Sequence, residues 1–270
     1  MVDRTAPDAY PDAGPGASRD ARPEARPDAP ATAEPRQRWR LIVARELAAP
    51  AHAQREVAEA WEAALVAGGL PIARTEGARA RLRVSFGAPL PNTMSAEGEL
   101  IDVVLTERWP VWRVREALGG RVPFGWRLVD AHDVWLAGPP LAGRVAGADY
   151  RITLRGTDPG AEGAPGRPSV RARLAEACAA ILASGALLRE RAKGGSTVQY
   201  DLRRLLLDVG VRPSTSPTDP IVLGTRTRFH PELGTGRPEE VVAALADVIE
   251  APLAIESIVR ERLILIEDLR

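Results

Sequence analysis

Side chains that could take part in chemistry gather in the segment RERAKGGSTVQYDLRRLLLDVGV, residues 189–211. It holds Lys193, the single lysine of the chain, directly before Gly194 and Gly195. A lysine beside glycines is typical of phosphate-binding loops, but such a loop reads GxxxxGK[ST] and stands between a strand and a helix. This segment has neither that spacing nor a helix after the glycines. It is therefore predicted to be a β-hairpin with its turn at Gly194 and Gly195, and not a nucleotide site.

The second arm of the predicted hairpin carries Tyr200, Asp201 and Arg203. Side chains two residues apart on a strand point to the same face. Asp201 and Arg203 are therefore expected to share a face and to form a structural ion pair. Together with Lys193 and Tyr200 they are also candidate binding residues, because an aromatic ring among basic groups can contact a partner or a nucleic acid.

Two carboxylates, Glu97 and Glu99, stand near the beginning of another predicted strand. At strand spacing they would share one face, where they could do acid–base work or bind a cation. The same pattern more often marks a solvated strand start. Both interpretations stay open from the sequence, and both residues are kept as candidates for binding.

Arginines at alternate positions form a further pattern. In the predicted strand ARLRVSF, Arg81 and Arg83 would lie on one face, opposite Leu82 and Val84. Similar basic positions recur later in the chain, at Arg189, Arg191, Arg204, Arg226, Arg228, Arg260 and Arg262. A basic sheet face can bind RNA, whereas acidic neighbours would make the same arginines part of a compensated, solvated face. The net charge of zero, from 36 basic and 36 acidic residues, favours neither interpretation.

Counts of residue types exclude several kinds of site. Cys178 is the single cysteine and lies in the apolar segment LAEACAAILAS, which reads as a buried helix face. An intrachain disulfide, an iron–sulfur cluster and a cysteine-based zinc site are therefore excluded. His52, His132 and His230 lack zinc-binding spacing. We expect no metal or other cofactor, and no catalytic residue can be named.

The sequence also bears on location. No apolar run approaches the roughly 18 residues of a membrane span, and the N-terminus lacks the apolar core of a signal peptide. We therefore expect a cytoplasmic protein without a membrane partner.

Composition and periodicity divide the chain into three parts. Residues 1–36 are rich in Pro, Ala, Asp and Arg and cannot bury enough surface to offset the entropy of ordering, so they are predicted to be a disordered tail. Residues 37–145 read as β-α-β-β-α-β, the order of a ferredoxin-like half. Residues 146–270 repeat that order in part, with an extra hairpin. The predicted fold is α+β, with two ferredoxin-like antiparallel sheets and helices on one face of each.

The expected elements follow from hydrophobic spacing, which has period 2 in strands and 3.6 in helices. Strands are expected at 38–47, 80–86, 98–107, 126–136, 148–156, 187–193, 196–211, 220–229 and 254–268. Helices are expected within 50–71, 109–123, 167–184 and 237–249. Alternation in the first strand puts Leu41, Val43 and Arg45 on one face.

Six stretches of the sequence, in order, resemble one protein family. They are AWEAALVAGGLPIARTEG (60–77), RVSFGAPLP (83–91), SAEGELIDVVLTE (95–107), ADYRITL (148–154), KGGSTVQYDLRRLLLDV (193–209), and RPEEVVAALADVI with IVRERLILIED (237–268). The chain is similar to the radical-SAM-linked family, also known as DUF2344, whose members occur beside or fused to a radical SAM protein. The resemblance covers most of residues 38–268.

The chain departs from the family in two places. A Ser-His-Leu-Asp phrase at the start of the first helix is missing around Ala53 to Glu56, and an Asn-Pro-containing segment is reduced to ARARLRV. The resemblance implies a cytoplasmic accessory protein that acts with a radical SAM partner, and it supplies no activity. The chain is not that partner itself, because the cluster of a radical SAM enzyme needs three cysteines.

Three hypotheses follow. The first is a non-catalytic accessory or substrate-presenting subunit of a radical SAM enzyme, with RNA as a candidate second partner. The second is a stand-alone RNA-binding or RNA-modifying protein, since two ferredoxin-like halves in one chain also resemble the architecture of pseudouridine synthases. The third is a purely structural interaction domain.

Overall fold

The computed structural model describes residues 33–155, 169–193, 195–216 and 219–269, without the side chains of Ala192 and Lys193. The predicted disordered tail, residues 1–36, therefore lies almost wholly outside the described residues. Within the described ranges, no helix is both long and apolar enough to cross a membrane.

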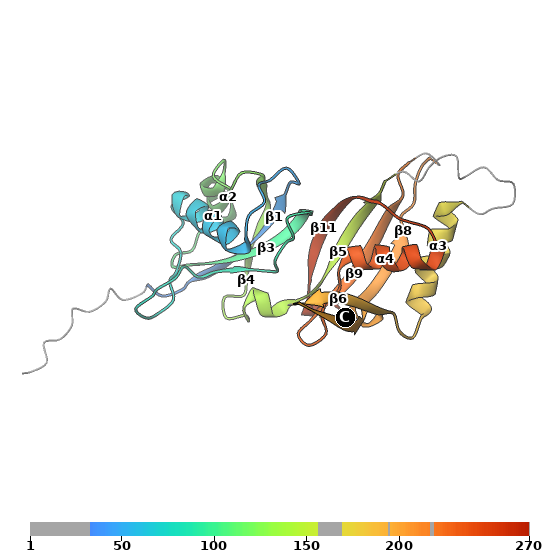
Figure 1. The fold of residues 1–270 in the computed structure, drawn as a ribbon. Helices are drawn as coiled ribbons and strands as arrows, with labels where there is room; N and C mark the ends of the chain where they lie inside the picture. Colours follow the sequence, from blue (N-terminus) through green and yellow to red (C-terminus); the bar gives the residue numbers. More distant parts are fainter. Residues whose placement is uncertain (1–32, 156–168, 194, 217–218, 270) are drawn as a thin grey trace, which may run out of the picture. The chain divides into compact units, whose positions relative to one another are not determined.

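The first half of the chain alternates strands with two helices. Its elements are β1 (Gln37–Arg45), α1 (Gln54–Ala67), β2 (Val84–Phe86), β3 (Ser95–Leu105), α2 (Val111–Leu118) and β4 (Trp126–Val134). Leu41 and Val43, at alternate positions of β1, are fully buried in the same core as Trp61 of α1 and Val114 of α2. The period-2 pattern of the strands thus places both helices on one face of these strands (Figure 1).

The second half has the same plan with additions. Its strands and helices are β5 (Val145–Leu154), α3 (Val170–Ala183), β6 (Leu188–Lys193), β7 (Ser196–Asp201), β8 (Leu206–Val211), β9 (Val222–His230), β10 (Gly234–Thr235), α4 (Pro238–Ile249) and β11 (Ile255–Leu265). Short 3-10 helices are η1 (Leu141–Arg144), η3 (Leu202–Leu205) and η4 (Ile266–Leu269). Leu174 and Cys178 of α3 and Leu245 of α4 pack in one core with Ile152 of β5. Cys178 is buried as predicted, and burial raises the pKa of its thiol to about 11.

The strands of both halves follow one order. In the first half the neighbouring strands lie in the order β2-β3-β1-β4, and in the second half they lie in the order β8-β9-β5-β11. Every neighbouring pair within these two sets is antiparallel. The two sets join in a nine-stranded sheet where β11 pairs in parallel with β3, at Val259 with Ser95 and Arg260 with Ala96.

The expectation of an α+β protein is confirmed at this level. The described residues form four α-helices and a large, mostly antiparallel sheet. The ferredoxin-like assignment of each half and the boundary at residues 145 and 146 stay predictions.

The hairpin forms as predicted, but the long strand expected at 196–211 does not. Strands β6 and β7 form a separate two-stranded sheet, called the ribbon below, in which Gly195 has a φ of +84° at the turn. After β7 the chain leaves the extended conformation for η3 because Leu202 and Leu205 turn inward and are fully buried. Strand β8 begins only after this turn.

This turn also overturns the predicted ion pair of Asp201 and Arg203. Asp201 Oδ1 accepts hydrogen bonds from the backbone N–H groups of Leu187 (2.8 Å) and Arg203 (3.0 Å). The guanidinium of Arg203 donates to two carbonyls instead, Leu182 O at 3.0 Å and Leu206 O at 2.8 Å. Because Arg203 lies in a 3-10 turn, it shares no strand face with Asp201. Both residues fix the base of the ribbon.

Replacing Asp201 tests this structural role. Asp201→Ala removes the acceptor of two backbone N–H groups and should lower the free energy of unfolding by about 1–3 kcal/mol. Asp201→Asn keeps an oxygen in place and should cost less than half as much. Urea unfolding followed by circular dichroism measures both. Equal stability of the alanine variant and the wild type would contradict the role.

Candidate functional site

Two buried arginines hold the segment GAPLPNTM, residues 87–94, called the clasped loop below. Arg45 at the end of β1 donates to Met94 O at 2.8 Å and Asn92 O at 3.4 Å. From β11, Arg260 donates to Pro89 O at 2.9 Å and Ala88 O at 3.1 Å. Irregular backbone leaves carbonyls without sheet partners, and guanidinium groups supply the missing donors.

Arg260 is held in turn by Glu99. The Nε of Arg260 lies 2.6 Å from Glu99 Oε1, and its Nη2 lies 2.5 Å from Oε2, which makes the pair bidentate. Arg260 is 1% exposed and Glu99 6%. Burial lowers the pKa of Arg260, but Glu99 and the hydroxyl of Tyr150 more than reverse this. A bidentate pair with further acceptors is the arrangement in which a buried charge is tolerated.

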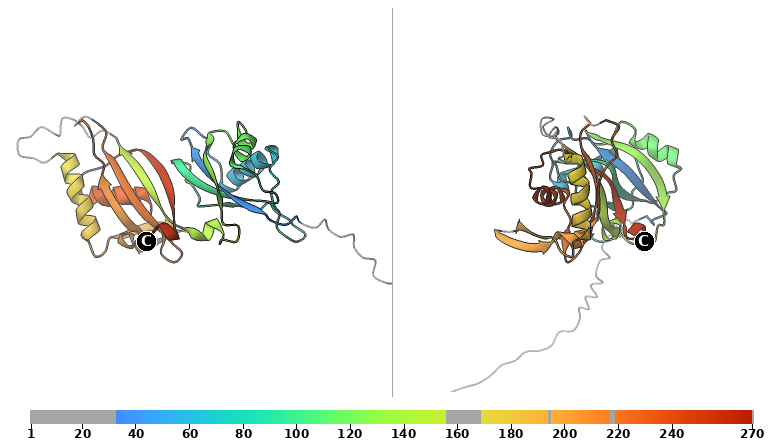
Figure 2. Two further views of the ribbon diagram at one scale, coloured as in Figure 1. Left: turned by 180° about the vertical axis from the view of Figure 1, so that it is seen from behind. Right: turned by 90° about the vertical axis from the view of Figure 1, so that its right-hand side faces the viewer.

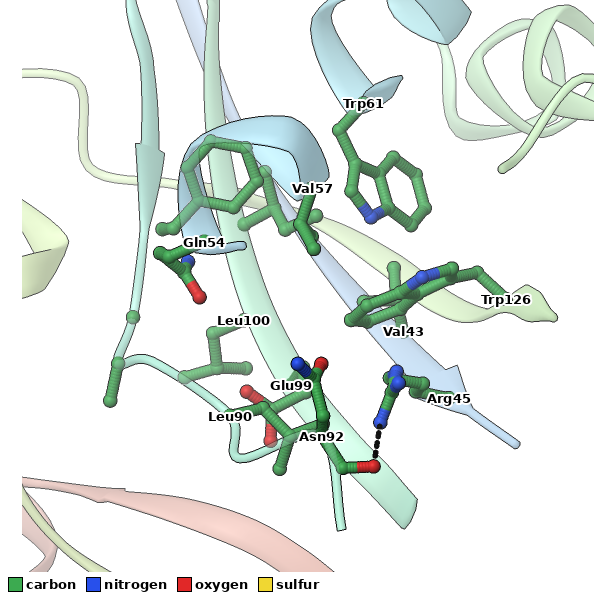
Figure 3. A pocket seen from close by; sticks show the side chains of 14 residues that line it. Val43, Arg45, Gln54, Val57, Trp61, Leu90, Asn92, Glu99, Leu100 and Trp126 are labelled. Atoms are coloured by element: carbon green, nitrogen blue, oxygen red, sulfur yellow. Dashed lines mark hydrogen bonds between the residues drawn. The ribbon is translucent and has the colours of Figure 1, made fainter. Parts of the chain in front are cut away.

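A small enclosed cavity lies on the Glu99 side of this pair. Its free volume is about 20 Å³, and Figure 3 shows Val57, Trp61 and Trp126 around it, with Arg45 bonded to the Asn92 carbonyl. Trp61 and Trp126 pack edge to face with ring centroids 5.7 Å apart. A cavity of this size holds about one water molecule and is too small for an organic ligand.

A larger open hollow lies on the Arg260 side and has a volume of about 460 Å³. Its walls come from the clasped loop, from β5, β9, β10 and β11, and from the first turn of α4. The lining residues include Pro89, Pro91, Met94, Tyr150, Phe229, Arg237, Glu239 and Arg260. This volume lies in the range of small-molecule sites.

The two carboxylates of the sequence prediction are separated, and the expectation that they share a face is wrong. In the pairing of β1 with β3, Val43 lies opposite Glu99 and Arg45 lies opposite Ala96. Two steps along β1 therefore correspond to three steps along β3, so β3 has one extra residue between Ala96 and Glu99. Glu97 is exposed and pairs with Arg151 at 2.5 Å, whereas Glu99 turns into the core. Gly98 allows β11 to approach, since a Cβ there would lie 2.7 Å from Glu261 O.

Arg81 and Arg83 lie outside the strand that was predicted for them. Only Val84–Phe86 pair with β3, and both arginines precede them with exposed side chains. Their backbones bond to Thr75 and Ala73, and neither side chain has an ion-pair partner among the described residues. Neither arginine lines the open hollow.

Two basic positions of β9 and β11, Arg226 and Arg262, belong to a compensated face. Asp149 bonds Arg226 at 2.7 Å and Arg262 at 2.7 Å. Burial raises the pKa of Asp149, but the hydrogen bonds from these two arginines lower it further than burial raises it. Glu261 likewise pairs with Arg151 and Arg212. The solvated, charge-paired interpretation therefore fits this face better than a free basic surface.

Two arginines of the ribbon have partners within the protein. Arg189 pairs with Asp247 of α4, and the guanidinium of Arg191 lies 4.7 Å from the ring centre of Tyr200. Burial, followed by Glu240, raises the pKa of Tyr200. The backbone of Lys193 pairs with Ser196, and its side chain lies outside the description. The Arg189–Asp247 pair thus ties the ribbon to α4, and the Arg191–Tyr200 contact lies within the ribbon.

Sequence reasoning missed a second buried cluster on the other face of β1. Arg38 and Arg40 both bond Asp102 of β3, at 2.6 to 2.9 Å, and all three are at most 6% exposed. Arg38 also donates to Gly138 O and Pro139 O. The signal was present, because charged residues interrupt the apolar runs RWRLIVAR and ELIDVVL.

Comparison with known proteins identifies the family. The family model described as "Uncharacterized protein conserved in bacteria (DUF2344)" matches residues 38–231. The chain belongs to the DUF2344 family. No curated protein matches it. A solved structure described as an unknown protein from Galdieria sulphuraria is 18% identical, over 81% of this chain and 98% of that chain, with a TM-score of 0.21.

The DUF2344 resemblance falls on the residues that build the clasped loop. The stretches RVSFGAPLP and SAEGELIDVVLTE contain residues 87–91 of the loop and Glu99. Arg260 lies in the stretch IVRERLILIED, beyond the residues that the family model matches. Where the Ser-His-Leu-Asp phrase is missing, α1 starts after Ala53, which has no capping side chain. Glu56 Oε2 compensates by accepting from Ala53 N at 3.0 Å. In the described parts of this DUF2344 chain, no three His, Cys, Asp or Glu side chains gather as metal ligands.

The buried pair can be tested against its exposed neighbour. Glu99→Gln leaves Arg260 buried without a counter-charge and should lower the free energy of unfolding by about 3–5 kcal/mol. Glu97→Gln breaks an exposed pair and should cost less than about 1 kcal/mol. Urea unfolding of both variants measures the difference. Equal losses would show that burial of the Glu99–Arg260 pair has no special weight.

Proposed function

We propose that this DUF2344 protein is a non-catalytic accessory subunit that docks on a radical SAM enzyme through its ribbon. The resemblance supplies the class of partner. The observation that carries the docking surface is the ribbon itself, whose second strand, β7, lies within the family stretch KGGSTVQYDLRRLLLDV (193–209). Figure 2 shows it extending away from the strands of the main sheet.

The ribbon has the properties of a prepared binding element. An isolated two-stranded hairpin is marginally stable in water. This one is held at its base by Asp201 and Arg203 and along its face by the Arg189–Asp247 pair. Leu188 is 62% exposed and Val198 39%, which is unusual for apolar side chains in a fixed strand pair. An ordered ribbon with apolar side chains and open edges can pair with a strand of another protein.

The RNA alternative has weaker support. Arg189 of the ribbon and Arg226 and Arg262 of the β9 and β11 face are matched by acids, so fewer arginines are free to replace the counterions of a phosphate backbone. Arg81 and Arg83 stay exposed without partners in the described part of the chain, but no aromatic side chain is known to lie beside them. A protein partner therefore fits the observations better.

The docking proposal is tested in the native host. Tagged wild-type protein should recover a radical SAM protein after mild cross-linking, identified by mass spectrometry. The double variant Leu188→Asp and Val198→Asp should reduce recovery by about tenfold or more, since each introduces a charge into an apolar contact. Val66→Asp, at another exposed apolar position in α1, is the matched control.

Two outcomes would contradict docking through the ribbon. One is recovery of no radical SAM protein by the wild type. The other is equal recovery by the wild type and the ribbon variant. Thermal unfolding of each variant separates lost docking from lost folding.

A further inference from the structure

The open hollow beside Arg260 contains an acid that the fold leaves without a partner. Glu239, in the first turn of α4, lines the hollow. Its carboxylate makes no hydrogen bond or ion pair with the described residues, and its Oε2 is shielded from solvent. A buried acceptor left unpaired costs about 1–3 kcal/mol, and more when it is charged. Glu240 Oε2 in the same turn is likewise shielded and unpaired, but Glu240 does not line the hollow.

The neighbouring cation is already committed. Arg260 donates to both oxygens of Glu99 and to two carbonyls of the clasped loop. Its charge is neutralised by Glu99, and its donors are not free for Glu239. Among the shielded polar atoms that line the hollow, the one without a partner is therefore an acceptor, Glu239 Oε2. A bound ligand could supply the missing donor.

Apart from Arg237, whose side chain is exposed to water, and Thr235, the rest of the wall is apolar and aromatic. Pro89, Pro91 and Met94 come from the clasped loop, and Tyr150 and Phe229 come from β5 and β9. Burial raises the pKa of Tyr150, and the charge of Glu239 adds a smaller contribution in the same direction. A carboxylate beside aromatic rings and apolar walls suits a cationic head on an apolar stem.

We propose that the open hollow binds an organic cation, an alkylammonium or alkylguanidinium group, with Glu239 as its counter-ion. The stem lies against Pro89, Pro91 and Met94, and the cationic head reaches the carboxylate of Glu239. The ligand is either a free amine or guanidine, or a lysine or arginine side chain of a polypeptide. The site is independent of the ribbon, so the two proposals can fail separately.

The chain offers a single reporter for this site. Its methionines are Met1 and Met94, and Met94 lines the hollow. In full-length protein with ¹³C-methyl methionine, the Met94 signal reports occupancy and the Met1 signal is the reference. The probes are n-butylammonium and n-butylguanidinium, with butanol and butyrate as neutral and anionic controls of the same stem.

The cations should shift the Met94 signal saturably, and butanol and butyrate should bind about tenfold more weakly or not at all. Glu239→Gln should weaken binding of the cations by about tenfold or more. Glu240→Gln is the matched control in the same helical turn, does not line the hollow and should leave binding unchanged. Arg237→Gln removes a positive charge from the lining and should leave binding unchanged or tighten it.

The proposal is overturned if butyrate or butanol binds as well as the cations, or if no probe shifts Met94. It is also overturned if Glu239→Gln binds the cations normally. Arg237→Gln keeps the test decisive should Glu239→Gln fail to fold, because weaker binding of the cations after removal of this positive charge would contradict a cation site. A blocked Gly-Arg-Gly peptide then separates the sources. Binding like butylguanidinium identifies a polypeptide side chain, and failure to bind identifies a free cation.

Discussion

The bidentate pair between Glu99 and Arg260 is the interaction on which the rest of this structure depends. It joins β3 to β11, where the strand orders of the two halves meet in one sheet. Two charges removed from water are tolerated only when geometry and further hydrogen bonds compensate their desolvation. Here the carbonyls of Ala88 and Pro89 provide that compensation, and so the pair also fixes the clasped loop.

The clasped loop connects this constraint with the candidate site. Arg45 holds the loop at Asn92 and Met94, and Arg260 holds it at Ala88 and Pro89. The loop separates an enclosed cavity of water size from an open hollow with an unpaired acid. A rigid wall of this kind suits recognition, whereas the ribbon offers a second surface for a protein partner. The two surfaces use different residues and different chemistry.

The sequence predicted what local patterns determine and missed what long-range packing determines. Hydrophobic periodicity located most elements, including the hairpin at Gly195 and the burial of Cys178. The alternation in β1 also placed Arg45 on the buried face. Nothing local shows that Arg260 finds Glu99 across 161 positions, nor that an extra residue in β3 turns Glu97 away from Glu99. The predicted strand at 196–211 is too long because the Asp201 side chain caps a turn there, and such a side-chain hydrogen bond can override an alternating strand pattern.

Hydrogen exchange of the clasped loop is the most direct test of this account. Peptide-resolved exchange should be compared between the wild type and Arg260→Lys, since a lysine cannot bond two carbonyls and both Glu99 oxygens at once. The account predicts exchange at residues 87–94 about tenfold or more faster in the variant, with α3 unchanged. Equal exchange of the loop in both proteins would contradict the claim that Arg260 holds it.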